Sequence, residues 1–179
     1  HHPTISRHWV HALTMPRELK YENGHVYQTP LKEMRRLRRD EVQTSLSING
    51  ADVSFPQIAG KSIELIIELL ETRGGLFEIT FRNSAKLIYD EAQNEVSLIR
   101  ENAKTGELET RTCLVSSLSR IHVFLDHSSL EIFLDGGKEV FTARYFPNEE
   151  DVSIVFAGHA VLDVKKWDLE GFEVEELEG

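Results

Sequence analysis

Cysteine is almost absent from this chain: Cys113 is the only one in 179 residues. A disulfide within the chain is therefore excluded, and a reducing, cytoplasmic compartment is favoured, although a secreted bacterial protein can also lack disulfides. Cys113 is followed by apolar Leu114 and Val115 in an expected strand, so we interpret it as a small core residue rather than a nucleophile. Long apolar runs are also missing, because none approaches the roughly 20 residues that a membrane-crossing helix needs.

Positive charge is scarce as well. The 20 Lys and Arg residues face 30 Asp and Glu residues, which gives a net charge of −10 and a sequence pI of about 5.3. An acidic chain repels phosphate backbones and anionic lipid surfaces, so we expect neither nucleic acid nor a membrane as a partner. Hydrophobic residues make up 40% of the chain, enough for the core of one domain with an appendage.

Signature motifs of catalysis are missing too. The sequence has no Gly-rich phosphate loop, no paired-cysteine zinc pattern, no His-Glu-x-x-His and no Gly-x-Ser-x-Gly. His8 and His11 lie three residues apart but make only an adventitious metal site with His1 and His2, so we expect no metal and no cofactor. The remaining histidines of interest are expected at the surface or in hydrogen bonds: His122, His127 and His159.

Period-two alternation is the strongest positive signal, and it is clearest between Ser119 and Pro147. The first apolar run consists of Ile121, Val123 and Leu125 at every second position, and a second such run is centred on Ile132. The chain then reverses at Asp135-Gly136-Gly137-Lys138. Alternation broken by a Gly-rich turn predicts three antiparallel strands in a meander.

Similar short runs fill most of the chain from Glu41 onward. Arg73-Gly74-Gly75 is expected to end a strand, and Gly158-His159 is expected to be a turn. About ten to twelve short strands with frequent turn residues predict an all-β fold, a two-sheet antiparallel β-sandwich of the jelly-roll or lectin-like kind. The expected strands are 42–48, 63–69, 77–81, 86–90, 95–101, 107–113, the meander, 152–157 and 160–169.

The N-terminal part has a different pattern. Glu22-Asn23-Gly24 predicts a hairpin, and an isolated hairpin is marginal in water, so another element should cover it. Pro30 to Arg39 predicts a short linker helix with an apolar stripe at Leu31, Met34 and Leu37. Its Lys and Arg residues could bind phosphate or an acidic partner. We favour the interpretation that these side chains contact the acidic remainder of the chain or the solvent.

Three residues near the first meander turn are candidates for sugar chemistry. Asp126 and Glu131 lie on adjacent expected strands, and glycosidic hydrolysis uses two carboxyl groups roughly 5–9.5 Å apart. The favoured interpretation is a turn in which Asp126, His127 and the serines cap backbone groups. A weaker functional alternative is that Asp126, His127 and Glu131 hold sugar hydroxyls.

Three segments together resemble the C-terminal portion of glycoside hydrolase family 32, the family of invertases, levanases and bacterial sucrose-6-phosphate hydrolases. They are HALTMPREL at 11–19, QTPLKEMRRLR at 28–38 and VFLDHSSLEIFLDGGKEVFTARYFP at 123–147. The resemblance is greatest to the bacterial branch and implies a five-bladed β-propeller followed by a β-sandwich. Within 1–29, His1-His2 looks like the remnant of a purification tag, and the resemblance places the following residues as the last piece of a missing propeller. It places 30–39 as the linker helix and 40–172 as the sandwich, and the acidic composition of 173–179 predicts a tail.

The resemblance also implies where the catalytic groups lie. The family's Asp nucleophile, Glu acid/base and stabilising Asp belong to Asn-Asp-Pro, Glu-Cys and Arg-Asp-Pro motifs of the propeller, and none of these occurs here. We therefore expect no catalytic residue in this chain. Many relatives have Arg where His127 stands, which weakens the expected contact with fructosyl hydroxyls.

Two functions stay open from the sequence. The first is an architectural domain that packs against the propeller and stabilises it, with a homodimer as a further alternative. The second is a binding module for fructose-containing sugars. A catalytic domain in its own right is the least favoured, because the chain offers no convincing acid/base pair.

Overall fold

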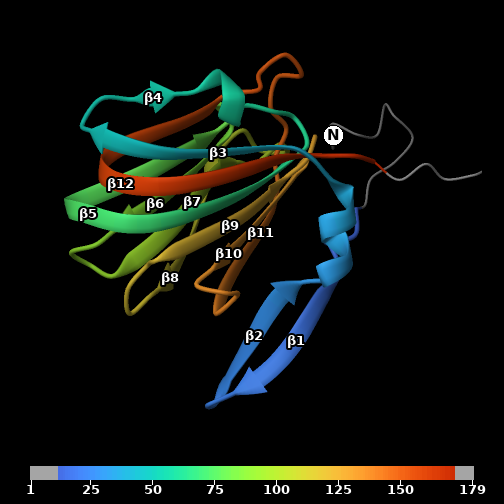
Figure 1. The fold of residues 1–179 in the computed structure, drawn as a ribbon, viewed down its shortest axis with the longest axis horizontal. Coiled ribbons are helices and arrows are strands. Elements are labelled where there is room, and N and C mark those ends of the chain that lie inside the picture. Colours follow the sequence, from blue (N-terminus) through green and yellow to red (C-terminus); the bar gives the residue numbers. More distant parts are fainter. Residues whose placement is uncertain (1–11, 172–179) are drawn as a thin grey trace, which may run out of the picture.

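The computed structural model describes residues 12–171, and this part of the chain is built almost entirely of strands (Figure 1). Two short 3₁₀ helices, η2 (Lys32–Leu37) and η3 (Pro56–Ile58), are the described helical elements. The strands are β1 (Arg17–Glu22), β2 (His25–Pro30), β3 (Arg38–Asn49), β4 (Val53–Ser54), β5 (Ile63–Phe81), β6 (Ala85–Asp90), β7 (Glu95–Glu101), β8 (Leu108–Leu114), β9 (Arg120–Leu125), β10 (Ser129–Leu134), β11 (Glu139–Arg144) and β12 (Ile154–Leu169).

The predicted antiparallel β-sandwich is confirmed, with two long strands that belong to both of its layers. The first part of β5, Ile63–Glu68, pairs with β9, and the last part, Leu76–Phe81, pairs with β6 on the same edge. One layer therefore runs β11-β10-β9-β5 and the other β5-β6-β7-β8. Strand β12 pairs with β5 along nearly all of its length and also with β3 and β4 (Figure 1).

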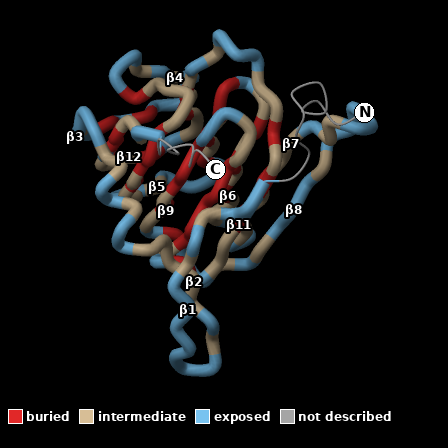
Figure 2. The backbone as a smooth tube through the Cα atoms, turned by 90° about the vertical axis from the view of Figure 1, so that its right-hand side faces the viewer, coloured by how far each residue is buried: buried red, intermediate tan, exposed pale blue. Residues whose placement is uncertain are grey.

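Alternate residues of both layers are buried and form one core, and the buried positions are red in Figure 2. The predicted meander β9-β10-β11 is confirmed, with Leu125 opposite Leu130 and Ile132 opposite Phe141. Burial of such a side chain contributes about 1.5–3 kcal/mol to folding, which makes this core the main source of stability. The fully buried aliphatic residues of the core include Ile58, Ile63, Leu65, Ile67, Ile79, Val96, Ile121, Val123, Leu125, Leu130, Ile132, Leu134 and Leu162.

Two predicted strand ends are wrong. Gly74 and Gly75, with φ of +67° and +102°, lie inside β5, and Gly158, with φ of +99°, lies inside β12. The register of β12 against β5 shifts next to Gly158, which is the mark of a β-bulge. Positive-φ glycines bend these strands where they pass from one layer to the other, instead of reversing the chain.

The N-terminal hairpin, β1 with β2, forms a two-stranded sheet of its own. The predicted hairpin is present, and Asn23 and Gly24 have φ of +51° and +80°, as a tight hairpin turn requires. The linker helix is shorter than predicted and is a 3₁₀ helix that ends at Leu37, so residues 38–39 begin β3. Spacing of three residues between its apolar side chains is the period of a 3₁₀ helix. Among residues 12–171, no helix is long and apolar enough to cross a membrane.

Candidate functional site

Two carboxylates are buried on the outer face of the β9-β10-β5 layer. Without the hairpin and the linker, side chains on this face of the sandwich would be exposed to solvent. Glu64 on β5 is 1% exposed and Glu131 on β10 is 4% exposed. The hairpin and the linker cover both carboxylates, and each contributes an arginine that forms an ion pair: Arg17 with Glu131 and Arg38 with Glu64. The two ion pairs join the N-terminal elements to the sandwich.

Glu64 holds the end of the linker. Arg38, the first residue of β3 after η2, donates from Nε to Glu64 Oε2 at 2.7 Å and from Nη2 to Glu64 Oε1 at 2.6 Å. His122 Nε2 lies 2.6 Å from the same Oε1. The guanidinium of Arg38 also lies over the Trp167 ring at 3.9 Å from its centroid. A bidentate pair stacked on an aromatic ring fixes both the position and the orientation of Arg38.

The electrostatics of Glu64 follow from these contacts. Burial by itself would raise the pKa of the Glu64 carboxyl, but hydrogen bonds from Arg38 and His122 outweigh it and hold that pKa below its usual value. The carboxylate therefore stays ionised at neutral pH, with both oxygens engaged.

Glu131 holds the base of the hairpin. Arg17 Nη2 donates to Glu131 Oε2 at 2.6 Å, and the Met15 backbone N–H donates to Glu131 Oε1 at 2.7 Å. The Arg17 guanidinium also lies 5.3 Å from the Phe133 ring centroid. Both oxygens of this carboxylate are thus occupied by the segment that precedes and begins β1.

A backbone contact also connects the hairpin to the sandwich. We call this contact and the two ion pairs, Arg17–Glu131 and Arg38–Glu64, the joint. The Gln28 N–H on β2 donates to the Gly137 carbonyl at 2.9 Å, and His25 Nε2 lies 2.6 Å from the Lys138 carbonyl oxygen. Gly137 belongs to the predicted turn between β10 and β11, which is confirmed by hydrogen bonds to the Leu134 carbonyl. The free edge of β2 therefore rests on this turn.

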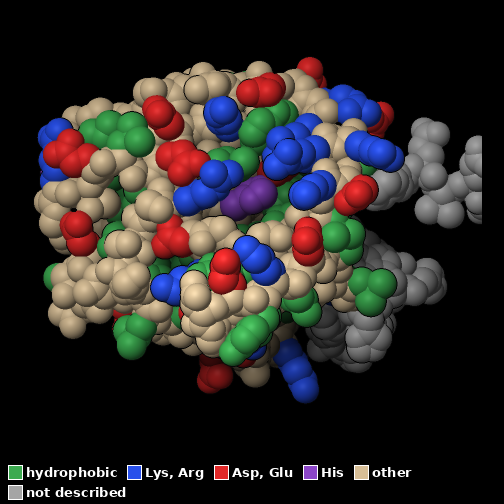
Figure 3. Space-filling model, turned by 60° about the horizontal axis from the view of Figure 1, so that its bottom comes forward, with side chains coloured by type: hydrophobic (Ala, Val, Ile, Leu, Met, Phe, Trp, Pro, Cys, Tyr) green, Lys and Arg blue, Asp and Glu red, His purple; other side chains and the backbone are tan. Residues whose placement is uncertain are grey.

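A basic hollow of about 230 Å³ lies between the linker and the outer face of the sandwich, and we call it the linker pocket. Figure 3 shows Lys and Arg side chains gathered on one face of the molecule, beside a histidine. Of the linker's basic residues, Arg38 pairs with Glu64 and Arg39 pairs with exposed Glu170. The charged and aromatic residues that line the pocket are Lys32, Arg35, Arg38, Glu64, Arg120, His122, Phe124 and Phe133.

The three predicted sugar-binding residues all line another hollow, of about 530 Å³. Asp126 and His127 are exposed in the β9–β10 turn, with His127 Nδ1 2.9 Å from Asp126 Oδ1. Glu131 faces the same hollow but is paired with Arg17. The Asp126 N–H donates to the Ser129 carbonyl, as expected of a turn. Each oxygen of the Glu131 carboxyl already accepts a hydrogen bond, one from Met15 and the other from Arg17.

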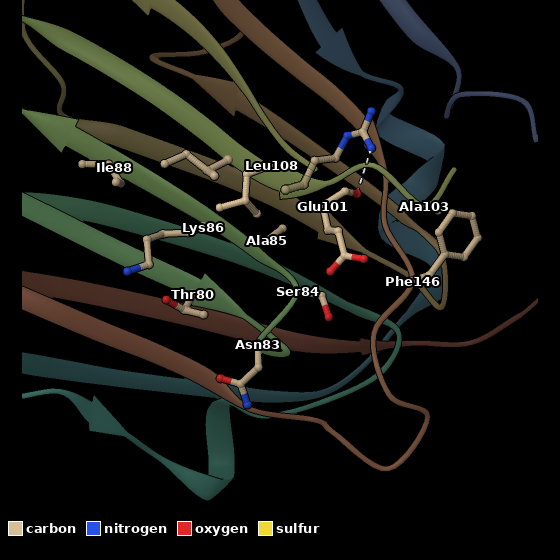
Figure 4. Close-up of a pocket in the computed structure, with 12 residues that line it drawn as sticks. Thr80, Asn83, Ser84, Ala85, Lys86, Ile88, Glu101, Ala103, Leu108 and Phe146 are labelled. Carbon is tan, nitrogen blue, oxygen red and sulfur yellow. Dashed lines mark hydrogen bonds between the residues drawn. The ribbon is translucent and has the colours of Figure 1, made fainter. Parts of the chain in front are cut away.

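A wider depression of about 690 Å³ lies on the outer face of the β6-β7-β8 layer (Figure 4). Its labelled residues include Lys86 and Ile88 on β6, Glu101 and Phe146. Glu101 is its one carboxylate among the described lining residues, whereas hydrolysis of a glycosidic bond uses two. This depression therefore lacks the groups of a glycosidase site.

The thiol and the histidines have structural surroundings. Cys113 packs against the core, and burial raises the pKa of its thiol to about 11, so it is not a thiolate at neutral pH. His122 and His127 are hydrogen-bonded as predicted. Between residues 12 and 171, no group of three or more His, Cys, Asp or Glu could hold a metal ion. His8 and His11 lie outside the described residues.

Comparison with known proteins identifies the family. Residues 31–170 match the family model described as "Glycosyl hydrolases family 32 C terminal". The chain belongs to glycoside hydrolase family 32. The family 32 match starts at Leu31, beside the linker helix, and ends at Glu170, so it takes in the whole sandwich.

The family 32 relatives are much longer than this chain. It is 34% identical over 170 residues to the sucrose-6-phosphate hydrolase of Bacillus subtilis, covering 94% of this chain and 35% of that protein. It is 32% identical over 182 residues to the enzyme of the same name from Staphylococcus xylosus, covering 95% and 37%. The chain thus spans about a third of the length of the curated relatives it matches.

Solved structures agree with this assignment. The sucrose-6-phosphate hydrolase from Lactobacillus gasseri superposes with a TM-score of 0.76 at 25% identity, over 94% of this chain and 36% of that one. The exo-inulinase from Aspergillus awamori has a TM-score of 0.70 at 18% identity, over 88% and 36%, which shows the shared fold. The chain is the C-terminal β-sandwich domain of the family.

Sequence reasoning missed Arg17 and Glu64, the two residues that with Arg38 and Glu131 form the joint. Glu64 and Glu68 stand on the same face of β5 and look alike in the sequence, yet the Glu68 side chain is 39% exposed and Glu64 is buried. The available signal was indirect: an orphan hairpin needs cover, and Arg17 opens that hairpin.

Proposed function

We propose that this chain is the non-catalytic β-sandwich domain of a longer fructosyl-bond hydrolase, and that it stabilises a catalytic domain on its N-terminal side. The single observation that carries the proposal is the hairpin, which projects from the sandwich (Figure 1) and has exposed apolar side chains on one face. The two buried ion pairs give this hairpin and the linker a fixed position on the sandwich.

Three exposed apolar side chains form one face of the hairpin. Leu19, Tyr21 and Val26 are 66%, 74% and 49% exposed, and the register places Tyr21 opposite Val26 on one face. Strand β1 has no partner other than β2 among the described strands. An open edge next to an apolar face fits a further strand of a preceding domain, as expected for the last piece of a β-propeller.

The activity of the longer protein follows from its relatives' names. Because the curated relatives are sucrose-6-phosphate hydrolases, we propose that the parent hydrolyses sucrose or sucrose-6-phosphate in the bacterial cytoplasm. Within this proposal, the segment 1–29 contains the last piece of the propeller, 30–39 connect the domains, 40–172 form the sandwich and 173–179 are a tail.

The test uses the longer protein with three substitutions on the apolar face, Leu19→Ser, Tyr21→Ser and Val26→Ser. We expect a lower melting temperature and partial loss of sucrose-6-phosphate hydrolysis, because the hairpin would no longer pack on the catalytic domain. The control carries Glu18→Ser and Lys20→Ser on the opposite face of β1 and should match the unsubstituted protein. A triple variant with unchanged stability and activity would remove the support for the proposal.

A second candidate is binding of a fructose-containing sugar at Asp126, His127 and Glu131, supported by their common position around one hollow. Calorimetry with fructose, sucrose and levan tests it, with Asp126→Ala and His127→Ala as the comparison. Absence of heat at millimolar sugar would end this candidate. Size-exclusion chromatography of the same samples tests the further proposal of a homodimer.

A further inference from the structure

We propose that the linker pocket is a binding site for a phosphoryl group carried on a small molecule. The pocket shares Arg38 and Glu64 with the contacts that hold the linker on the sandwich. The proposal does not depend on the function proposed above. It rests on three properties of the pocket: a local surplus of positive charge, donors that are not engaged elsewhere, and a small apolar floor.

The pocket has a surplus of positive charge, although the chain as a whole is acidic. Four cationic side chains line the pocket, from Lys32, Arg35, Arg38 and Arg120, against the single carboxylate of Glu64. The chain carries a net charge of −10, so such a concentration of Lys and Arg is not a consequence of composition. A concave basic surface attracts anions more strongly than scattered charges do.

Glu64 does not neutralise the remaining cations. Both of its oxygens accept hydrogen bonds from Arg38, and His122 approaches one of them. Arg120 pairs with Glu68 at 2.9 Å in a half-exposed ion pair. Lys32 and Arg35 are exposed and have no ion-pair partner among the described residues, so their donors are free to meet a ligand.

Two free cations around one hollow match a dianion better than a monoanion. A phosphate monoester carries about −1.5 to −2 charges at pH 7 and three strong acceptor oxygens, whereas a carboxylate carries −1. Arg35 can donate two parallel N–H bonds to such a group and Lys32 can act as a point charge.

The size and floor of the pocket limit the rest of the ligand. A volume of about 230 Å³ is below the roughly 300–1,000 Å³ of sites for drug-sized ligands. Ile66, Phe124 and Phe133 line the same pocket and offer apolar surface. A phosphoryl group attached to no more than one small ring, such as a hexose phosphate, is the class of ligand that fits.

The test is calorimetric titration of the 179-residue chain with inorganic phosphate, a hexose 6-phosphate, the unphosphorylated hexose and acetate, all at an ionic strength of about 0.15 M. We expect saturable binding of the two phosphorylated probes and neither of the others. The tighter of the two phosphorylated probes identifies whether free phosphate or a sugar phosphate is the preferred ligand.

Charge-matched double variants separate a built site from general attraction. Lys32→Ala with Arg35→Ala should weaken phosphate binding at least tenfold, because two charge-assisted contacts are lost. Arg36→Ala with Arg111→Ala removes the same charge from exposed residues outside the pocket and should change affinity less than twofold. Equal effects of the two variants, acetate binding as tight as phosphate, or no saturable heat up to about 10 mM phosphate would each overturn the proposal.

Discussion

Gly137 and Gln28 approach so closely that a side chain at residue 137 has no room: its β-carbon would lie 1.8 Å from the carbonyl oxygen of Gln28. The same two residues share the backbone hydrogen bond from the Gln28 N–H to the Gly137 carbonyl. The turn between β10 and β11 thus supports the hairpin only because residue 137 is a glycine. Docking of the N-terminal elements depends on this contact as well as on the two buried ion pairs.

Gly137→Ala should release the hairpin from the sandwich. Gly136 provides a matched control, because both glycines have positive φ, +73° and +84°, but nothing lies within 4 Å of a β-carbon at Gly136. Both variants bear the cost of a left-handed alanine, about 1–2 kcal/mol, and only Gly137→Ala adds the collision. Hydrogen exchange of the Gln28 amide should accelerate at least tenfold in Gly137→Ala and not in Gly136→Ala. Equal exchange rates in the two variants would contradict the contact.

Arg38 and Arg39 are neighbours with very different surroundings. The Arg38 pair with Glu64 is nearly buried, whereas the side chains of Arg39 and Glu170 are 52% and 60% exposed. Arg38→Ala leaves a buried carboxylate without its main partner and should lower the free energy of unfolding by about 3 kcal/mol. Arg39→Ala should lower it by less than about 1 kcal/mol. Urea unfolding followed by far-UV circular dichroism measures both, and similar losses would refute the distinction.

Glu64 should make the sandwich sensitive to acid. The folded-state pKa of Glu64 lies below its ordinary value of 4.5, so its contribution to stability is complete above about pH 4.5. This contribution is lost as the pH falls from 4.5 through the lower folded-state pKa, because the unfolded chain binds the proton more readily. Glu64→Gln should therefore show a smaller fall in unfolding free energy between about pH 5 and pH 3. Parallel pH profiles of the two proteins would show that Glu64 does not contribute.

The meander from Arg120 to Arg144 was predictable because its information is local. Alternating apolar residues define the inward face of each strand, and Asp135 with the glycines after it defines the reversal. The sandwich as a fold class followed from many such segments. In each case the hydrophobic period and the turn chemistry agree with the tertiary structure.

The course of β5 and β12 was not predictable from the same signals. Gly75 and Gly158 have the positive φ that a turn would use, but each lies in a strand that continues into the second layer. The reason is tertiary: a β-carbon at Gly158 would lie 2.1 Å from the Leu76 carbonyl oxygen, so this glycine permits close approach of two bent strands. Local sequence does not distinguish a reversal from a bend between layers.

The joint was beyond sequence reasoning for a similar reason. Arg17 and Glu131 are 114 residues apart in the chain, and nothing near either residue indicates its partner. Glu131 was recognised as a notable carboxylate, but its partner became visible only when the hairpin was placed. The role of Asp126, His127 and Glu131 in sugar binding stays a prediction.

Release of glucose from sucrose and sucrose-6-phosphate by the isolated chain tests the central claim most directly. We predict no release above a buffer blank, because Glu131, which shares a hollow with Asp126, already accepts hydrogen bonds from Arg17 and Met15. The longer protein, assayed in parallel, should release glucose. Turnover by the 179-residue chain alone would contradict the assignment of this sandwich as a non-catalytic domain.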